Sequence, residues 1–144
     1  MNYGDLIRLY FERSTALQWY WTIYIVVIGG ILGFSTLRQR PETVTAILVT
    51  VLFVCFAYKN LGAIEATLTQ QQAIRSVIAE YPATGANEED IKRVRSALEP
   101  HLSLSESVGV WYFHMTCNLL TIAAVWAKEW RRRENLAHPP AAAA

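Results

Sequence analysis

Polar side chains interrupt the apolar stretch at residues 109–126, whose sequence is GVWYFHMTCNLLTIAAVW. An imidazole, a thiol and an amide occur there, and such groups can bind a metal, line a water path or hydrogen-bond between helices. At helical spacing they share one narrow angular sector with further polar residues. The complete row comprises Ser107, His114, Cys117, Asn118, Thr121 and Lys128. Because an unpaired polar group in hydrocarbon costs about 2–7 kcal/mol, the row should face protein or water.

Two interpretations of this row involve no bound ion. In a packing seam, His114 and Asn118 would hydrogen-bond to Gln18 or Thr22 on another apolar segment. In a pore, several copies of the segment would surround an axis. The amide and hydroxyl oxygens would then line a path, the histidine would gate it, and the basic residues that follow would ring its inner mouth.

A metal site is the third interpretation. His114 and Cys117 are three residues apart and could share an ion, with Met115 or Cys55 nearby. A histidine and a cysteine supply two ligands, whereas a structural site usually needs four, so several subunits would have to contribute. The apolar segments contain no CxxC or HxxxH pair. We therefore expect no metal or other cofactor.

Composition and motifs argue against several classes of function. The sequence contains no GxSxG, HExxH, P-loop or GxGxxG motif, so we predict no enzymatic activity. The net charge is +1, which provides no strong field for nucleic acid. The two cysteines, Cys55 and Cys117, both lie in apolar runs, so a disulfide framework is not expected.

Three apolar segments must position these residues, and they span 16–37, 44–58 and 108–126. A hydrocarbon core of ~30 Å needs about 20 helical residues. The first and third segments meet that length, and the second continues past Lys59, whose ammonium can snorkel outward. The pattern predicts an all-α integral membrane protein with three transmembrane helices.

Additional helices are expected outside the spans. Residues 2–14 have amphipathic spacing and predict an interfacial helix, with one unbroken helix into the first span as the alternative. No helix breaker lies between Thr43 and Pro82, so the second helix should leave the membrane after about residue 58. The expected elements are an interfacial helix at 2–14, a first span at 16–37, a long helix at 43–81, a return helix at 87–99, a third span with a basic extension at 105–133, and a disordered tail at 137–144.

Small and polar residues mark the faces through which helices associate in lipid, where burying apolar surface gains little. The face on the first span contains a GxxxG pair and comprises Gln18, Thr22, Gly29, Gly33 and Thr36. It could pack within the chain or against another subunit. A heptad-like seam on the second helix comprises Ala46, Thr50, Phe53, Ala57, Leu61, Ile64 and Leu68. The short return helix would cover only part of this seam, so we expect a homo-oligomer, with a kink at Gly62 as the alternative.

Basic residues near the span ends predict the orientation. One side carries Arg38, Arg40, Lys128, Arg131, Arg132 and Arg133. The other side carries Arg8, Arg13 and Lys59. The first side, which includes the C-terminus, should be cytoplasmic, and the 59–106 hairpin should lie outside. We expect a multi-pass protein of a cell membrane, such as a bacterial inner membrane.

The sequence thus favours a small homo-oligomeric channel-like or pore-forming subunit with a polar path along the third span. The alternative is a non-conducting membrane scaffold or accessory subunit of a larger complex, in which the same faces hold helices together. An intersubunit His/Cys metal site has the least support. The expected partners are membrane lipid and further copies of the chain, without nucleic acid.

Overall fold

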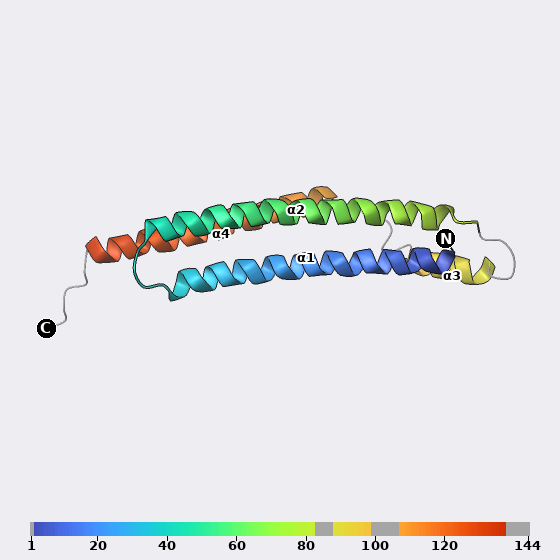
Figure 1. Cartoon of the computed structure of the whole chain (residues 1–144), viewed down its shortest axis with the longest axis horizontal. Helices are drawn as coiled ribbons and strands as arrows, with labels where there is room; N and C mark the ends of the chain where they lie inside the picture. The colour runs from blue at the N-terminus through green and yellow to red at the C-terminus, as the bar shows by residue number, and fades with distance from the viewer. Residues whose placement is uncertain (1, 83–87, 99–106, 138–144) are drawn as a thin grey trace. The chain divides into compact units, whose positions relative to one another are not determined.

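A computed structural model describes residues 2–82, 88–98 and 107–137 of the 144-residue chain. These residues form four helices and no strand (Figure 1). The helices are α1 (Tyr3–Leu37), α2 (Thr43–Glu80), α3 (Glu88–Leu98) and α4 (Ser107–Ala137). The all-helical prediction is confirmed. Three stretches, Tyr3–Leu37, Thr43–Glu80 and Gly109–Ala137, are long and apolar enough to cross a membrane.

Helix α1 is continuous, so the prediction of separate helices at 2–14 and 16–37 is wrong. The helix begins with a reciprocal cap, in which Asp5 N–H donates to Asn2 Oδ1 at 2.8 Å and Asn2 N–H donates to Asp5 Oδ2 at 3.1 Å. At the expected break, the Thr15 hydroxyl donates to the Phe11 carbonyl at 3.0 Å. That hydroxyl therefore bonds back into the preceding turn and does not cap a new helix.

The other boundaries lie close to those expected. Helix α2 occupies Thr43–Glu80 and includes Gly62 without interruption, and the alternative of a kink there stays a prediction. Helix α3 matches the expected return helix over its described residues, and its acidic first turn suits a helix N-terminus. Helix α4 ends at Ala137, four residues later than expected. Residues 87, 99, 105–106 and 138–144 of the expected elements lie outside the described part of the chain.

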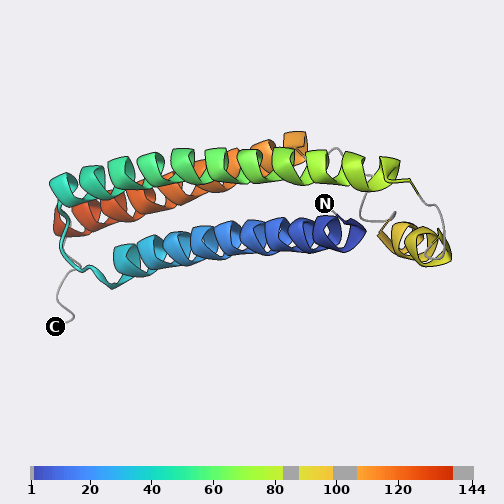
Figure 2. The ribbon, with the colours of Figure 1, turned by 45° about the vertical axis from the view of Figure 1, so that its right-hand side comes forward.

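The chain divides into two compact units, and both α1 and α2 contribute to each. Unit 1 comprises residues 1–21 and 62–110, and unit 2 comprises residues 22–61 and 111–144. Within unit 2, α2 and α4 lie side by side in two views (Figures 1 and 2), and the Trp126 indole donates to the Thr50 hydroxyl at 3.2 Å.

Unit 1 has an apolar core. Leu6 and Tyr10 of α1 are buried against Ile78 of α2, and partly buried side chains surround them. The surrounding residues are Tyr3, Ile7, Ile74 and Tyr81. The apolar face predicted for the start of α1 is thus buried against protein. Its polar face is exposed, as shown by the solvated ion pair between Arg8 and Glu12.

Helix α3 caps the C-terminal end of α2 in unit 1. The Arg95 guanidinium donates to the carbonyls of Ile78 at 3.2 Å and Tyr81 at 2.7 Å. The last carbonyls of a helix have no partners within it, so a cation placed there both satisfies them and complements the helix dipole. This contact gives the return helix a specific docking position on α2.

Candidate functional site

Unit 2 buries a polar cluster among its three helices. This inner polar cluster consists of Tyr24 from α1, Asn60 from α2, and His114 and Asn118 from α4. The side chains of His114 and Tyr24 are almost entirely buried, at 0% and 1% exposure, although both belong to apolar helices. His114, the histidine of the row predicted on the third span, therefore faces the interior of a single chain.

The cluster is tightly connected. The Tyr24 hydroxyl donates to Asn118 Oδ1 at 2.8 Å and also lies 3.2 Å from the His114 carbonyl oxygen. The Tyr24 and His114 rings stack, with centroids 4.1 Å apart and planes inclined by 21°. The Asn118 amide nitrogen lies 3.0 Å from His114 Nδ1, and the Asn60 amide nitrogen lies 3.5 Å from His114 Nε2. Polar atoms of two helices thus approach both ring nitrogens.

This arrangement satisfies a neutral histidine. A neutral imidazole has one donor and one acceptor nitrogen. Because Asn118 Oδ1 accepts from Tyr24, its amide nitrogen donates to His114 Nδ1. The protonated Nε2 donates to Asn60 when that amide presents its oxygen. Both ring nitrogens of His114 can therefore be paired without a net charge. The chemistry available to the cluster is hydrogen bonding between helices, which is the packing-seam interpretation.

The remaining residues of the predicted row lie at varied positions. Thr121 is buried, and its hydroxyl donates to the Cys117 carbonyl at 2.7 Å. Cys117 is partly buried, and the Lys128 ammonium donates to the Thr36 hydroxyl of α1. Ser107 belongs to α4, but its side chain lies outside the described part of the structure. The predicted partners Gln18 and Thr22 are both exposed.

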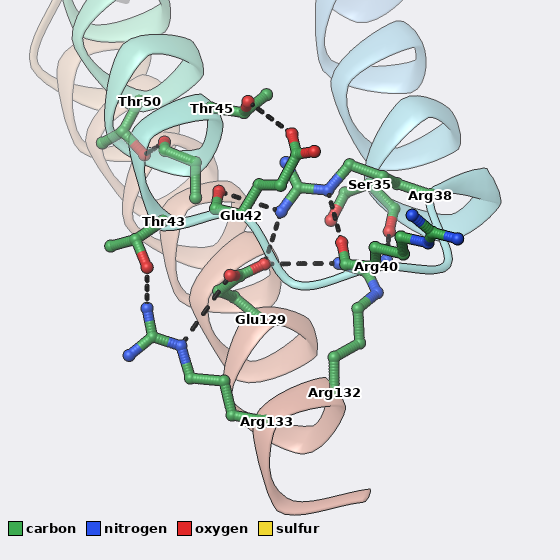
Figure 3. Close-up of polar contacts among 11 residues, drawn as sticks. Ser35, Arg38, Arg40, Glu42, Thr43, Thr45, Thr50, Glu129, Arg132 and Arg133 are labelled. Atoms are coloured by element: carbon green, nitrogen blue, oxygen red, sulfur yellow. Dashed lines mark hydrogen bonds and ion pairs between the residues drawn. The ribbon is translucent and has the colours of Figure 1, made fainter. Parts of the chain in front are cut away.

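A second polar site lies at one end of unit 2 and was not predicted. We call it the arginine cluster, and it consists of Glu129, Arg132 and Arg133 of α4 with Arg38, which follows α1 (Figure 3). The Glu129 side chain is only 2% exposed. Its Oε2 atom lies 2.5 Å from an Arg38 nitrogen and 3.6 Å from an Arg132 nitrogen, and its Oε1 atom lies 3.8 Å from Arg133 Nε.

The arginines also join the ends of three helices to one another. The Arg38 guanidinium donates to the carbonyls of Arg40 at 3.2 Å and Glu42 at 3.1 Å, which fixes the link between α1 and α2. Arg132 donates to the Ser35 carbonyl, and Arg133 donates to the Thr43 hydroxyl (Figure 3). A buried carboxylate needs such charged partners. Glu129 thereby organises one end of the bundle.

A signal for Glu129 was present in the sequence. Thr121, Val125 and Glu129 follow one another at four-residue spacing and are all buried, so the internal face of α4 continues beyond the predicted row. The sequence interpretation used the arginines to predict the orientation and, in the pore interpretation, to ring the inner mouth. It therefore overlooked the one acidic residue among them that lies on the internal face.

The predicted packing faces divide into a covered one and an open one. Six residues of the α2 seam are buried within the single chain, namely Ala46, Phe53, Ala57, Leu61, Ile64 and Leu68, and Thr50 is partly buried. The seam therefore does not itself require a second copy. By contrast, Gly29 and Gly33 are exposed, and a Cβ built on either would meet nothing within 4 Å. Thr36 on the same face is also exposed.

The structure adds no ligands to the suggested metal site. Among the described residues, no group of three or more histidine, cysteine, aspartate or glutamate side chains could hold an ion. Cys55 is exposed and Cys117 is partly buried, and neither forms a disulfide.

Comparison with known proteins provides no family. No protein-family model, curated protein or solved structure matches this chain. The function must therefore be inferred from the two polar clusters and from the surface of the unit that contains them.

Proposed function

We propose that this chain is an integral membrane protein and serves as a non-conducting scaffold or accessory subunit. In this proposal the helices of unit 2 cross the bilayer, and the arginine cluster lies at the cytoplasmic side, where basic residues concentrate. The observation that carries the proposal is the complete burial of His114 beneath Tyr24 inside one chain.

The surface of unit 2 supports the membrane location. Large apolar side chains point outward from all three helices, including Val26 at 66% exposure, Leu52 at 60% and Leu119 at 69%. In water such a surface would be an aggregation hazard, whereas in lipid it is the expected one. The polar side chains of the inner polar cluster lie inside. This distribution satisfies polar groups internally, as a hydrocarbon environment requires.

The same distribution disfavours the channel predicted from the sequence. A pore built around α4 would need its polar row to face an axis shared by several subunits. In the structure, however, Thr121 and His114 face inward in one chain, and Asn118 hydrogen-bonds to Tyr24. Opening a path along this row would require breaking those contacts. A packing role uses the contacts as they are.

The open face of α1 supports a role in assembly. Glycines spaced as in Gly29 and Gly33 let two transmembrane backbones approach closely, and both positions are uncovered in the single chain. In the proposed scaffold, this face contacts a transmembrane helix of another subunit. That subunit is either a second copy of the chain or a different member of a larger complex.

A flux assay tests the non-conducting part of the proposal. Potassium-loaded liposomes that contain the purified protein should release no more potassium than loaded liposomes without protein. Release on addition of valinomycin should confirm that the vesicles are sealed. The assay should be repeated at neutral and acidic pH, because the sequence suggested a histidine gate. Flux that depends on the protein and disappears in His114→Ala would support the channel and contradict the scaffold.

Substitution of the glycines tests assembly. Gly33→Leu should reduce the size of the native complex extracted in mild detergent and leave the fold of the single chain intact, because no atom crowds the position. Phe34→Leu provides the control, because Phe34 is 48% exposed and lies about 100° around the helix from Gly33. Equal effects of Phe34→Leu and Gly33→Leu, or a wild-type protein that is monomeric without a partner, would contradict an assembly role for this face.

A further inference from the structure

The arginine cluster carries more positive charge than its carboxylate balances. Three guanidinium groups surround Glu129, and Arg38 and Arg132 are mostly buried there, with side-chain exposures of 15% and 14%. The side chain of Arg133 is 51% exposed. Arg131 and Arg40 are also exposed at this end of unit 2. The opposing carboxylates besides Glu129 are those of Glu42 and Glu134.

An apolar groove runs along α4 beside these charges. Its volume is about 610 Å³, and its lining consists of Trp126, Ala127, Glu129, Trp130, Arg133, Glu134 and Ala137. Both indoles are open to the surroundings, at 37% exposure for Trp126 and 69% for Trp130. The Trp130 indole nitrogen donates to Glu134 Oε1 at 2.6 Å, which gives that carboxylate a partner within the groove wall. The groove therefore has aromatic walls. Its charged end places Arg133 beside Glu129 and Glu134, and the exposed Arg131 flanks it one turn beyond Ala127.

We propose that this groove binds an anionic phospholipid, with the acyl chains against Trp126 and Trp130 and the phosphodiester beside Arg131 and Arg133. Tryptophan prefers the headgroup level of a bilayer, and arginine binds phosphate through charge-assisted hydrogen bonds. A neutral headgroup would leave the excess positive charge of the arginine cluster uncompensated. A cytoplasmic leaflet supplies the anionic lipid required. This inference rests on the proposed membrane location.

Lipid retention measured by native mass spectrometry tests the inference. The full-length protein in detergent receives phosphatidylglycerol or phosphatidylcholine with identical acyl chains. We expect the anionic lipid to be retained about tenfold more strongly. Arg131→Gln/Arg133→Gln should remove most of this preference. Arg8→Gln/Arg93→Gln, which removes the same charge from exposed positions in unit 1, should preserve it.

Two further measurements distinguish a lipid site from a structural effect of losing Arg133 and from a site for phosphate alone. Arg131→Gln alone leaves the contacts of Arg133 with Glu129 and Thr43 intact and should weaken retention by about threefold. A large excess of inorganic phosphate should not displace the lipid, because phosphate lacks the acyl chains that contact the indoles. Equal retention of both lipids, equal loss in the unit 1 control, or displacement by phosphate would overturn the inference.

Alkaline carbonate extraction of native membranes distinguishes the absence of the proposed lipid site from the absence of the proposed membrane location. Wild-type protein that stays in the membrane but shows no headgroup preference would overturn only the lipid site. Wild-type protein that is extracted by carbonate would contradict the membrane location itself.

Discussion

The two units of this chain hold their helices together with different chemistry. Unit 1 packs Leu6, Tyr10 and Ile78 into an apolar core. Unit 2 instead buries His114 and Glu129 among its helices and exposes many of its large apolar side chains. The same two helices, α1 and α2, contribute to both units, so the change in chemistry occurs along continuous helices.

Under the proposed membrane location, the difference between the units reflects which contacts water and lipid each make favourable. In water, burying apolar surface stabilises a helix contact by about 25 cal/mol for each Å², so an apolar core is sufficient. In hydrocarbon that gain is absent, and helices associate through close packing and hydrogen bonds. The contrast between the units is therefore what we expect if unit 2 lies in lipid and the core of unit 1 is exposed to water when it unfolds.

Loss of the buried carboxylate should have the largest effect on unit 2. Glu129→Gln leaves three arginines without their counter-ion, and removing one partner of a buried charge network costs about 3–5 kcal/mol. Unfolding by titration with dodecyl sulfate in mixed micelles measures this free energy. Glu134→Gln, at an exposed carboxylate of the same helix, should change it by less than about 0.5 kcal/mol. Similar effects of the two substitutions would show that the arginine cluster does not stabilise unit 2.

An apolar truncation should act on unit 1. Ile78→Ala removes a side chain that is 0% exposed and should cost about 2–4 kcal/mol. Faster amide hydrogen exchange in residues 62–80 would report the loss. The adjacent Val77→Ala is the control, because Val77 is 48% exposed and should change the exchange little. If the two variants exchange alike, the apolar cluster is not the core of this unit.

The inner polar cluster should show a smaller, pairwise effect. In a double-mutant cycle, Tyr24→Phe and Asn118→Leu should be coupled by about 0.6–1.7 kcal/mol, because the hydroxyl donates directly to the amide oxygen. The micelle titration provides the four free energies. Purely additive effects would mean that this hydrogen bond does not hold α1 against α4.

The smallest effect should come from a solvated pair on α3. The Lys92 ammonium donates a hydrogen bond to Glu88 at 2.5 Å and holds the pKa of that carboxyl below its ordinary value of 4.5. Because the folded-state pKa is lowered, the pair's contribution to stability is present above the unfolded-state pKa and fades as pH falls through the folded-state pKa. Lys92→Gln should raise the pKa of Glu88 toward 4.5, as followed by carboxyl chemical shifts in NMR. An unchanged pKa would show that the pair does not persist in solution.

Helical patterns made much of the fold predictable. The continuous pattern without breakers placed α2 within one residue of its observed end. The amphipathic spacing of residues 2–14 indicated an apolar face, but it did not show that this face packs against α2. The break expected at Thr15 was wrong because a threonine hydroxyl can either cap a helix or bond back to the preceding turn. Local sequence does not distinguish these two bonds.

The site was only partly predictable for a similar reason. Periodicity showed that His114 and Asn118 share a face, but it did not show which residues that face meets. The prediction did not include Tyr24, whose ring is buried against His114. Glu129 lies close in sequence to several arginines, and such a basic segment is typical of a solvated surface. Both partners depend on which helices pack together, and this information lies outside any single segment.

The central claim is that the polar row of α4 faces protein while its neighbours face lipid. Spin labels placed one at a time at residues 118–121 in liposomes test it, because oxygen accessibility is high in lipid and a water-soluble nickel chelate reports an aqueous path. We predict high oxygen accessibility at Leu119 and Leu120 and low accessibility to both reagents at Asn118 and Thr121. High chelate accessibility at Asn118 would reveal a water-filled path, and high oxygen accessibility there would place the row in lipid. Either result would contradict the account.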